Sequence, residues 1–273
     1  MNNSTIGAAV SMSSLQQRLD IIADNIANMN TTGYKSKEGS FEDVLTRVQQ
    51  QSQDYYQTGR SMPLGFNIGY GVRVSTISNN WEEGTLQETG NPTDLALLGN
   101  GLFGVQVNGE VAYTRQGAFH FTPDPDNADS MLLVDNTGNS VLNTEGEPIA
   151  VPVNVSAAID EYGRVLTKRS ENEPAVIAGT IMIAEPLSKS TLQAVDGNFY
   201  VLPEGVAAEQ AFIQRAPGEA AAVSVRSGYL EQSNVDLSKE MTEMMQIQRI
   251  YQLAARALSS SDQMLGLANN MRG

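Results

Sequence analysis

The sequence contains no cysteine and a single histidine, His120. No disulfide can form, and the thiolate and imidazole ligands of ordinary zinc sites are too few. A Cys–His nucleophile pair is excluded for the same reason, and no G-x-S-x-G stretch indicates a serine hydrolase. Carboxylates are plentiful, so an acid–base hydrolase that uses two of them stays open as an alternative.

Positive charge is also scarce. The 17 Lys and Arg residues face 31 Asp and Glu residues, which gives a net charge of −14. This excess argues against binding to nucleic acid or to anionic membrane surfaces. No apolar run reaches the roughly 20 residues that span a bilayer, so we expect no membrane insertion. The opening "MNNSTIGAAV" has no basic segment before an apolar core, and we expect no cleaved signal peptide.

Apolar residues near the N-terminus recur at alternating spacings of three and four residues. They are Met12, Leu15, Leu19, Ile22, Ile26 and Met29. This rhythm predicts a helix with one heptad seam, flanked by polar Ser14, Arg18 and Asn25. We expect Gly33 to end the helix. Asn25 and Asn28 lie beside the seam, where a buried Asn can set the register of a helix pair.

The last forty residues have two apolar stripes with the same rhythm, after an N-cap at Ser233, Asn234 or Asp236. The first stripe consists of Met244, Ile247, Tyr251, Ala254, Leu258, Ser261, Leu265 and Ala268. The second consists of Ile250, Leu253, Ala257, Ser260, Met264, Leu267 and Met271. A helix with two seams needs partners on two sides. We predict the N-terminal helix as one partner and a second molecule as the other. An ordinary helix pair that covers one face of a β domain stays open.

The middle of the chain has the alternation of β-strands. "VQVNGEVAY" (105–113) alternates around Asn108–Gly109, which predicts a type I′ hairpin. "LLVDNTGNSVL" (132–142) and "IDEYGRVLT" (159–167) repeat the strand–turn–strand pattern. We therefore predict an α+β protein with a mostly antiparallel central domain.

Four segments follow from these patterns. Residues 1–35 form a core helix, 36–63 a connector, 64–231 a β-rich outer domain, and 232–273 a second core helix that packs on the first. The Gln-rich part of the connector, "TRVQQQSQDYYQTGRSM" (46–62), is expected to be partly helical.

Two stretches look like ligand-binding motifs. "GNGLFG" (99–104) matches the G-x-G-x-x-G dinucleotide pattern, which requires a helix to begin at the glycines. Here a hairpin follows, so we expect Gly99, Gly101 and Gly104 to make turns and to bind no cofactor. The acidic "DPDNADS" (124–130) lacks the central glycine of a calcium loop and has Ala128 at a ligand position, so we expect no metal site.

Several longer motifs resemble a known family. "LQQRLDIIADNIANMNTTGYK" (15–35) is similar to the N-terminal signature of the axial rod and hook proteins of the bacterial flagellum. "GVRV" (71–74), "EEGTLQETGNPTDLALLGNGLFGV" (82–105) and "AYTRQGAFHF" (112–121) resemble the middle motifs of this family. "SGYLEQSNVDLSKEMTEMMQIQRIYQLAARALSSSDQMLGLANN" (227–270) resembles its C-terminal signature.

The resemblance implies a structural subunit that polymerises into a hollow helical tube, with paired terminal helices inside and the β domain outside. Its partners would be copies of itself, other rod and hook proteins, and the flagellar type III export apparatus. Its place would be the basal body, outside the cytoplasmic membrane. Length and motif order are most similar to the distal rod member. A proximal rod subunit and a non-flagellar β-domain binding module stay open as alternatives.

Overall fold

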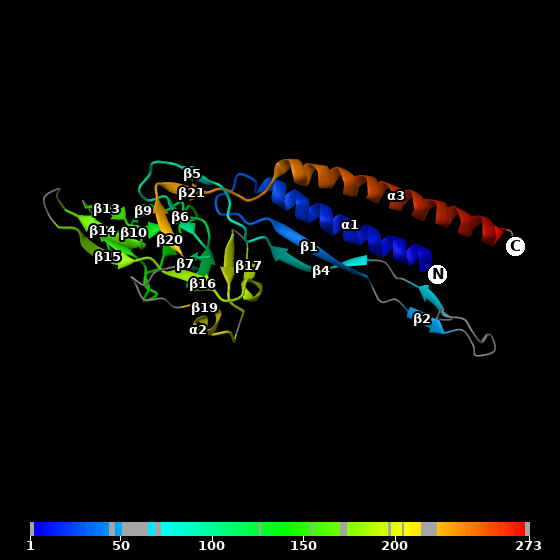
Figure 1. The fold of residues 1–273 in the computed structure, drawn as a ribbon, viewed down its shortest axis with the longest axis horizontal. Coiled ribbons are helices and arrows are strands. Elements are labelled where there is room, and N and C mark those ends of the chain that lie inside the picture. The colour runs from blue at the N-terminus through cyan, green and yellow to red at the C-terminus, as the bar shows by residue number, and fades with distance from the viewer. Residues whose placement is uncertain are drawn as a thin grey trace. The chain divides into compact units, whose positions relative to one another are not determined.

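The computed structural model describes residues 3–43, 47–50, 65–68, 72–125, 127–153, 155–169, 174–195, 198–203, 205–213 and 223–270. They form long helices and antiparallel strands, so the predicted α+β class is confirmed (Figure 1). The chain divides into two compact units. The helix–hairpin unit comprises Met1–Ala27, Lys37–Asn80 and Val235–Gly273, and the β unit comprises Asn28–Ser36 and Trp81–Asn234. This division differs from the predicted boundary at residue 64. Independent folding of 64–231 stays a prediction.

Two long helices lie side by side in the helix–hairpin unit, α1 (Asn3–Ala27) and α3 (Leu237–Asn270) (Figure 1). Strand β1 (Lys37–Asp43) pairs antiparallel with β4 (Val72–Asn79), and both strands contact α1. Strands β2 (Arg47–Gln50) and β3 (Gly65–Ile68) form a second antiparallel pair. No helix in the described part of the chain combines the length and apolar character of a membrane span.

The connector prediction needs correction. Residues 37–43 and 47–50 are strands, so the helix expected within 46–62 is wrong where the chain is described. Residues 46 and 51–62 lie outside the described residues. Alternating side chains in "KEGSFED" allow β1 to pair with the β-branched "VRVSTISN" of β4. The sequence reading overlooked this partner because it lies beyond the Gln-rich stretch.

The end of α1 also differs from the prediction. The helix stops at Ala27, so Met29 and Gly33 lie beyond it. The Thr31 amide donates to the Asn28 carbonyl, which makes a turn directly after the helix. Gly33 has φ +70°, and a Cβ there would lie 2.6 Å from the backbone carbon of Arg115. Gly33 is therefore required for a close backbone approach inside the β unit, and not as a helix stop.

The start of α3 is as predicted. Asp236 Oδ1 accepts hydrogen bonds from the backbone amides of Ser238 (2.9 Å) and Lys239 (3.2 Å). Such a side-chain cap satisfies amides that have no partner within the helix. Of the three predicted N-cap candidates, the structure selects Asp236.

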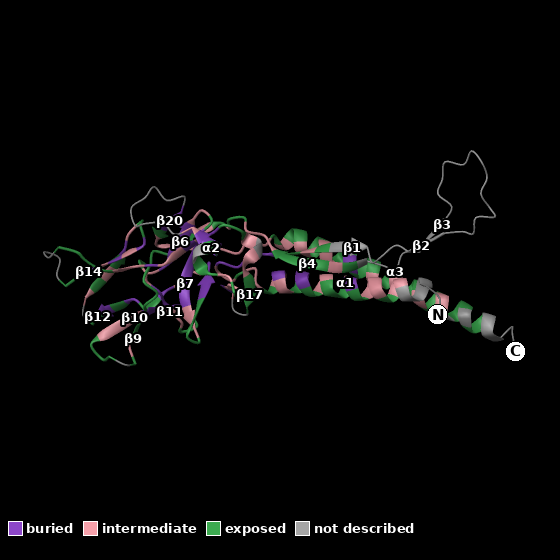
Figure 2. Ribbon diagram, turned by 90° about the horizontal axis from the view of Figure 1, so that it is seen from below, coloured by how far each residue is buried: buried purple, intermediate pink, exposed green. Residues whose placement is uncertain are grey.

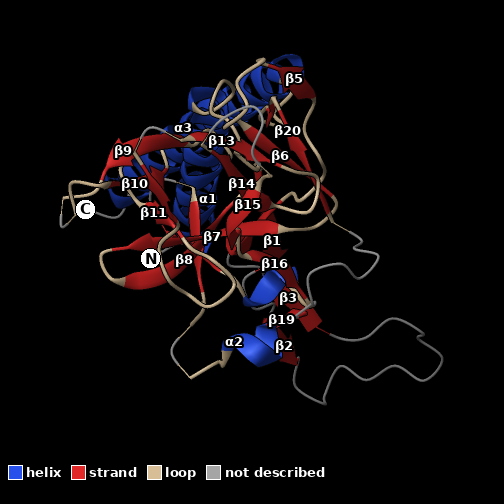
Figure 3. Ribbon diagram, turned by 90° about the vertical axis from the view of Figure 1, so that its left-hand side faces the viewer, coloured by secondary structure: helices blue, strands red, loops and turns tan. Residues whose placement is uncertain are grey.

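The β unit is built from short antiparallel strands (Figure 3). Its longest sheet path is β12 (Ala150–Pro152), β10 (Ser130–Val134), β11 (Ser140–Val141), β7 (Leu102–Val107), β8 (Glu110–Thr114), β18 (Phe199–Val201) and β17 (Gln193–Val195). Strands β9 (His120–Pro123), β16 (Ile183–Pro186) and β19 (Phe212–Ile213) pair at the sides of this path. Strands β13 (Ser156–Ile159), β14 (Arg164–Lys168) and β15 (Val176–Thr180) form a separate sheet. Helix α2 (Ala208–Ala211) and a 3-10 turn, Lys189–Thr191, complete the unit.

The predicted hairpin is confirmed. Val107 pairs with Glu110, and Asn108 and Gly109 have φ of 51° and 88°. A type I′ turn needs positive φ at both of these positions. Strand–turn–strand units at 132–142 and 159–167 are confirmed too, by the pairs β10–β11 and β13–β14.

Strands from late in the sequence complete the β unit. Strand β20 (Ser224–Ser227) pairs with β6 (Leu95–Leu98), and β21 (Tyr229–Glu231) pairs with β5 (Leu86–Glu88). Val223 and Val225 join Leu95 and Leu97 in the main apolar core, which also contains the edge-to-face ring pair of Phe103 and Phe119. The core therefore needs residues from both halves of the chain.

Candidate assembly surface and buried ion network

Arg18 connects α1 to α3. Its guanidinium donates to Glu243 of α3, with Nε 2.9 Å from Oε1. Ser14, one turn earlier, is buried. The predicted polar flank of α1 therefore includes a buried residue, Ser14, and a partly exposed one, Arg18, which contacts α3. Both atoms of the ion pair remain partly exposed, so its contribution to stability is small.

Asn25 is a junction between three elements of the helix–hairpin unit. Its Oδ1 accepts from the Lys37 amide (2.8 Å), and its Nδ2 donates to the Lys37 carbonyl (3.0 Å) at the start of β1. Nδ2 also donates to Glu240 Oε1 of α3 at 3.2 Å. Asn25 is 2% exposed. Both polar atoms of this amide thus contact β1, and its nitrogen also contacts α3; the register role of Asn25 stays a prediction.

Asn28 has a different environment. It follows the end of α1, and its Oδ1 accepts from the Thr31 hydroxyl at 3.1 Å. Its side chain therefore shapes the turn after the helix.

Glu240 lies among other carboxylates near this junction. Burial raises the pKa of its carboxyl group, the hydrogen bond from Asn25 opposes that rise, and the negative charge of Glu243 adds to it. The hydrogen bond from Asn25 therefore offsets part of the cost of placing this carboxylate beside α1.

The first stripe of α3 is the more buried one. Ile247 is 2% exposed, and the described members around it are partly buried: Met244, Tyr251, Ala254, Leu258 and Ser261. The side chains of Leu265 and Ala268 lie outside the described residues. In α1, Ile22 is 3% exposed, and Met12, Leu15, Leu19 and Ile26 are partly buried. Met29, also partly buried, belongs to the β unit.

The second stripe of α3 is exposed (Figure 2). Ile250 is 50% exposed, Leu253 63%, Met264 66% and Leu267 65%. Ala257 and Ser260, which lie between them on the stripe, are exposed as well. Met271 lies outside the described residues. The helix therefore presents an apolar strip that no described residue of this chain covers. We call this strip the outer stripe.

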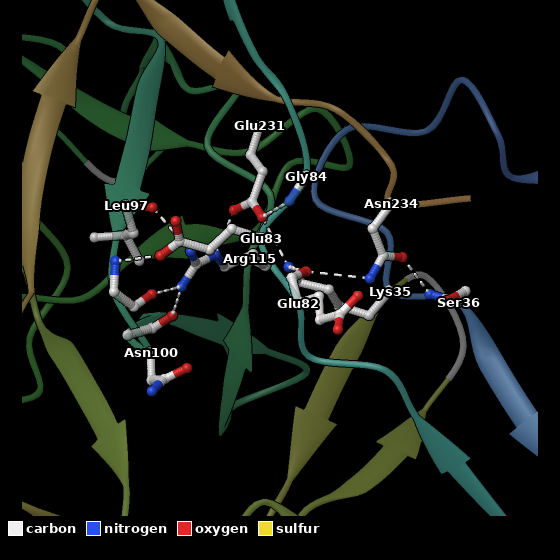
Figure 4. A network of polar contacts seen from close by, with 12 residues as sticks. Lys35, Ser36, Glu82, Glu83, Gly84, Leu97, Asn100, Arg115, Glu231 and Asn234 are labelled. Carbon is white, nitrogen blue, oxygen red and sulfur yellow. Dashed lines mark hydrogen bonds and ion pairs between the residues drawn. The ribbon is translucent and has the colours of Figure 1, made fainter. Parts of the chain in front are cut away.

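The β unit contains an ion network that the sequence reading missed (Figure 4). Glu231 accepts from Lys35 Nζ at Oε1 (2.7 Å) and from Arg115 Nε at Oε2 (2.5 Å). Glu231 Oε1 also accepts from the Gly84 amide at 2.9 Å. Each of the three charged side chains is at most 3% exposed. Two cations thus share one carboxylate in a site from which water is excluded.

Backbone carbonyls accept four further hydrogen bonds from the two cations. Arg115 Nη1 donates to Gly99 O and Gly101 O, each at 2.6 Å, and Nη2 donates to Leu97 O at 2.8 Å. Lys35 Nζ donates to Glu82 O at 2.6 Å. The surplus positive charge is therefore surrounded by carbonyl dipoles, as a buried charge requires.

The same contacts explain the glycine motif at 99–104. Residues 99–101 join β6 to β7 and no helix begins there, so the predicted turn role of Gly99 and Gly101 is confirmed. For Gly104 it is wrong, because this residue lies within β7 and pairs with Tyr113. The loop directs carbonyl oxygens toward Arg115, whereas a phosphate site needs free amides. The Gly99 amide itself donates to Glu83 Oε1 at 2.6 Å. Added Cβ atoms at Gly101 and Gly104 would lie 2.6 Å from Val223 and Met182 side-chain atoms.

The electrostatics of the network agree with its geometry. Burial alone would raise the pKa of Glu231, but the charges and hydrogen bonds of Arg115 and Lys35 hold it below its ordinary value. Burial lowers the pKa of Lys35, and Glu231 opposes this effect. The carboxylate is thus stabilised by its two partners.

The single histidine and the acidic stretch 124–130 are on the surface of the β unit. His120 is exposed in β9. The described residues of 124–130 form a largely exposed loop, in which Ser130 Oγ donates to Asp124 Oδ2. In the part of the chain that the structure describes, no cluster of three His, Cys, Asp or Glu residues could hold a metal ion.

Family models match three parts of the chain. The model described as flagella basal body rod protein matches residues 8–35. The flagellar hook protein FlgE/F/G D1 domain matches residues 96–167, and the flagellar basal body rod FlgEFG protein C-terminal model matches residues 226–271.

Complete relatives agree with these matches. The flagellar basal-body rod protein FlgG of Borreliella burgdorferi is 32% identical over 266 residues, which cover 97% of each chain. The chain belongs to the flagellar rod and hook protein family. In Bacillus subtilis, FlgG is 32% identical over 96% of each chain. The hook-basal body complex protein FlhP of that organism is 30% identical over 100% of each.

The predicted resemblance and the flagellar rod function are thereby confirmed. The relatives are named as rod and hook-basal body proteins, and none of these names supports a hydrolase or a binding module outside the flagellum. Each matched segment of this rod-family chain contributes one charge to the network: Lys35, Arg115 and Glu231. The outer stripe lies within the C-terminal match.

Proposed function

We propose that this chain is a subunit of the distal rod, and that it polymerises into a hollow helical tube that transmits torque to the hook. Its relatives are named as rod proteins, which supports a structural role in the basal body. The single observation that carries polymerisation is the outer stripe of α3. Exposed apolar strips of this kind mark protein–protein contacts.

The two stripes of α3 have different tasks in this proposal. The first packs within the subunit, where Ile247 is almost fully buried and α1 lies alongside. The second, which includes the exposed Leu253 and Met264, packs on a neighbouring copy. The terminal helices then form the core of the tube, as heptad-patterned helices of this length do when they find partners.

The net charge of the C-terminal segment does not oppose packing between identical copies. Residues 233–273 contain four basic and four acidic residues, so the segment is neutral although the chain has a net charge of −14. Neighbouring α3 helices in a tube would therefore not repel each other through net charge. The excess of acidic residues lies elsewhere in the chain, in the part that would face outward.

The remaining partners follow from the same role. The subunit would be exported through the flagellar type III apparatus and would work outside the cytoplasmic membrane. It would contact proximal rod proteins on one side and hook proteins on the other. A position in the proximal rod is the alternative, and binding to purified rod and hook proteins distinguishes the two.

Paired aspartate substitutions test the proposal. Purified chain at increasing concentration should form tubes in electron micrographs. Leu253→Asp should leave the circular dichroism of the free subunit unchanged and prevent tubes, because the charge enters the outer stripe. Ile247→Asp should already lose helical signal in the free subunit, because an unpaired charge at a buried position costs several kcal/mol.

The control is Gln248→Asp, which adds the same charge at an exposed position of α3 outside both stripes. It should form tubes like the parent chain. If Leu253→Asp polymerises as well as Gln248→Asp does, the outer stripe is not an assembly surface.

A further inference from the structure

The β unit is closed by segments from opposite ends of the chain. Lys35 comes from the N-terminal segment 28–36, and Glu231 ends β21, which pairs with β5. The Gly33 amide donates to the backbone carbonyl of Glu231 at 2.8 Å. The side chain and the backbone of Glu231 thus hold the N-terminal segment in the unit.

Glu231 is also the carboxylate that forms ion pairs with both buried cations. Among the described residues, no other carboxylate forms an ion pair with Lys35 or Arg115. Before β21 docks, closing the unit would bury Lys35 and Arg115 without an ion-paired carboxylate, and Glu83 favours the positive charge of Lys35 only through space. Removing one partner from a buried pair shifts a folding equilibrium by on the order of a hundredfold or more.

We propose that Glu231 is a folding latch, which keeps the β unit open until the segment 223–234 has docked. Strands β7 and β8, formed much earlier in the chain, then become stable only together with β20 and β21. The latch needs both ends of the chain, since Lys35 and Glu231 lie near opposite ends. Its consequence in the cell rests on the proposed function: a subunit in transit through a channel stays unfolded until both ends are free.

Substitutions in the full chain test the latch at equilibrium. Trp81, the single tryptophan, packs against the ring of Tyr200 in the β unit at an interplanar angle of 44°, and its fluorescence reports the unfolding of this unit. Glu231→Gln should lower the folding equilibrium constant on the order of a hundredfold. The control Glu88→Gln removes an exposed carboxylate from β5, which pairs with β21, and should have little effect. Equal urea midpoints for the two variants would overturn the proposal.

A triple variant keeps the test decisive if Glu231→Gln does not fold. Lys35→Met/Arg115→Met/Glu231→Met removes more contacts but leaves no buried charge. Replacing a buried ionic triad by apolar residues of similar volume is often neutral or stabilising. The triple variant also leaves the carbonyls of Leu97, Gly99 and Gly101 without their donor, so its reference is Lys35→Met/Arg115→Met, which loses the same contacts and leaves Glu231 as an unpaired buried charge. The triple variant should have the higher urea midpoint of the two. Equal midpoints would show that an unpaired buried charge does not hold the unit open.

The order of closure is tested by hydrogen exchange with pulse labelling during refolding of the full chain. In the parent chain, amides of β7–β8 (102–114) should become protected in the same kinetic step as those of β20–β21 (224–231). In the triple variant, 102–114 should become protected first. Early protection of 102–114 in the parent chain, or no change of order in the triple variant, contradicts the latch. A failure to form tubes would contradict the proposed function but would leave this result unchanged.

Discussion

Arg115→Lys keeps the positive charge at this position but removes the planar guanidinium and its set of separately directed donors. The guanidinium donates four hydrogen bonds to atoms that lie in different directions: one to Glu231 and three to the carbonyls of Leu97, Gly99 and Gly101. A lysine has three donors on one nitrogen at the end of a flexible stem. It can pair with Glu231 or approach the loop, but it cannot reach all four acceptors.

The size of the effect follows from the acceptors left behind. We expect two of the three carbonyls to lose their partner, and each buried, unsatisfied polar group costs about 1–3 kcal/mol. The substitution should therefore destabilise the β unit by about 2–6 kcal/mol. This is a large part of the about 5–15 kcal/mol that keeps a domain folded.

Urea unfolding followed by Trp81 fluorescence measures this loss. The midpoint should fall while the slope of free energy against urea stays the same, since the surface exposed on unfolding does not change. Arg226→Lys is the matched control, because Arg226 is exposed and lies over the ring of Tyr229. Equal midpoints for the two variants would show that the carbonyl contacts of Arg115 contribute little, and would refute the reasoning.

Two further predictions concern the junction and the boundary of the β unit. Asn25→Asp places a second carboxylate beside Glu240, whose pKa is already raised by burial. Because a raised carboxyl pKa makes the folded state bind more protons than the unfolded state, the variant should be destabilised at neutral pH and should gain stability as pH falls toward about 5. Thermal melts across this pH range measure the effect. A pH-independent deficit would contradict this. A fragment of residues 28–234 should melt cooperatively and at a higher temperature by circular dichroism than one of 64–231, because only the longer fragment contains Lys35. Equal melting temperatures would mean that the segment 28–36 is dispensable.

Local sequence patterns predicted the features that are determined by residues close together in the chain, such as the faces of a helix and the dihedral angles of a turn. The spacing of Ile247 and Leu253 separated a buried stripe from an exposed one, because side-chain direction in a helix follows from the helical period. Asn108–Gly109 predicted its hairpin because few residue pairs accept positive φ at two successive positions.

The ion network could not be predicted in this way. Lys35 and Glu231 are 196 residues apart and Arg115 is 116 residues from Glu231, and no local period connects them. The one available signal was a charged residue, Arg115, between the apolar residues of "VAYTRQGAF", and this signal does not identify the residue with which Arg115 pairs. The partner of Arg18 could not be predicted for a related reason. The N-terminal pattern shows a polar residue beside a helix seam, but the opposite charge, Glu243, comes from the other end of the chain.

The central claim is that the outer stripe is free in the subunit and covered in the assembled tube. Because the chain has no cysteine, Leu253→Cys introduces a single thiol, and its rate of alkylation reports access to the stripe. Gln248→Cys, at an exposed position outside both stripes, is the reference. The account predicts that Leu253→Cys is alkylated rapidly in the free subunit and severalfold more slowly after polymerisation, while Gln248→Cys is slowed much less. Undiminished alkylation of Leu253→Cys in tubes would contradict the account.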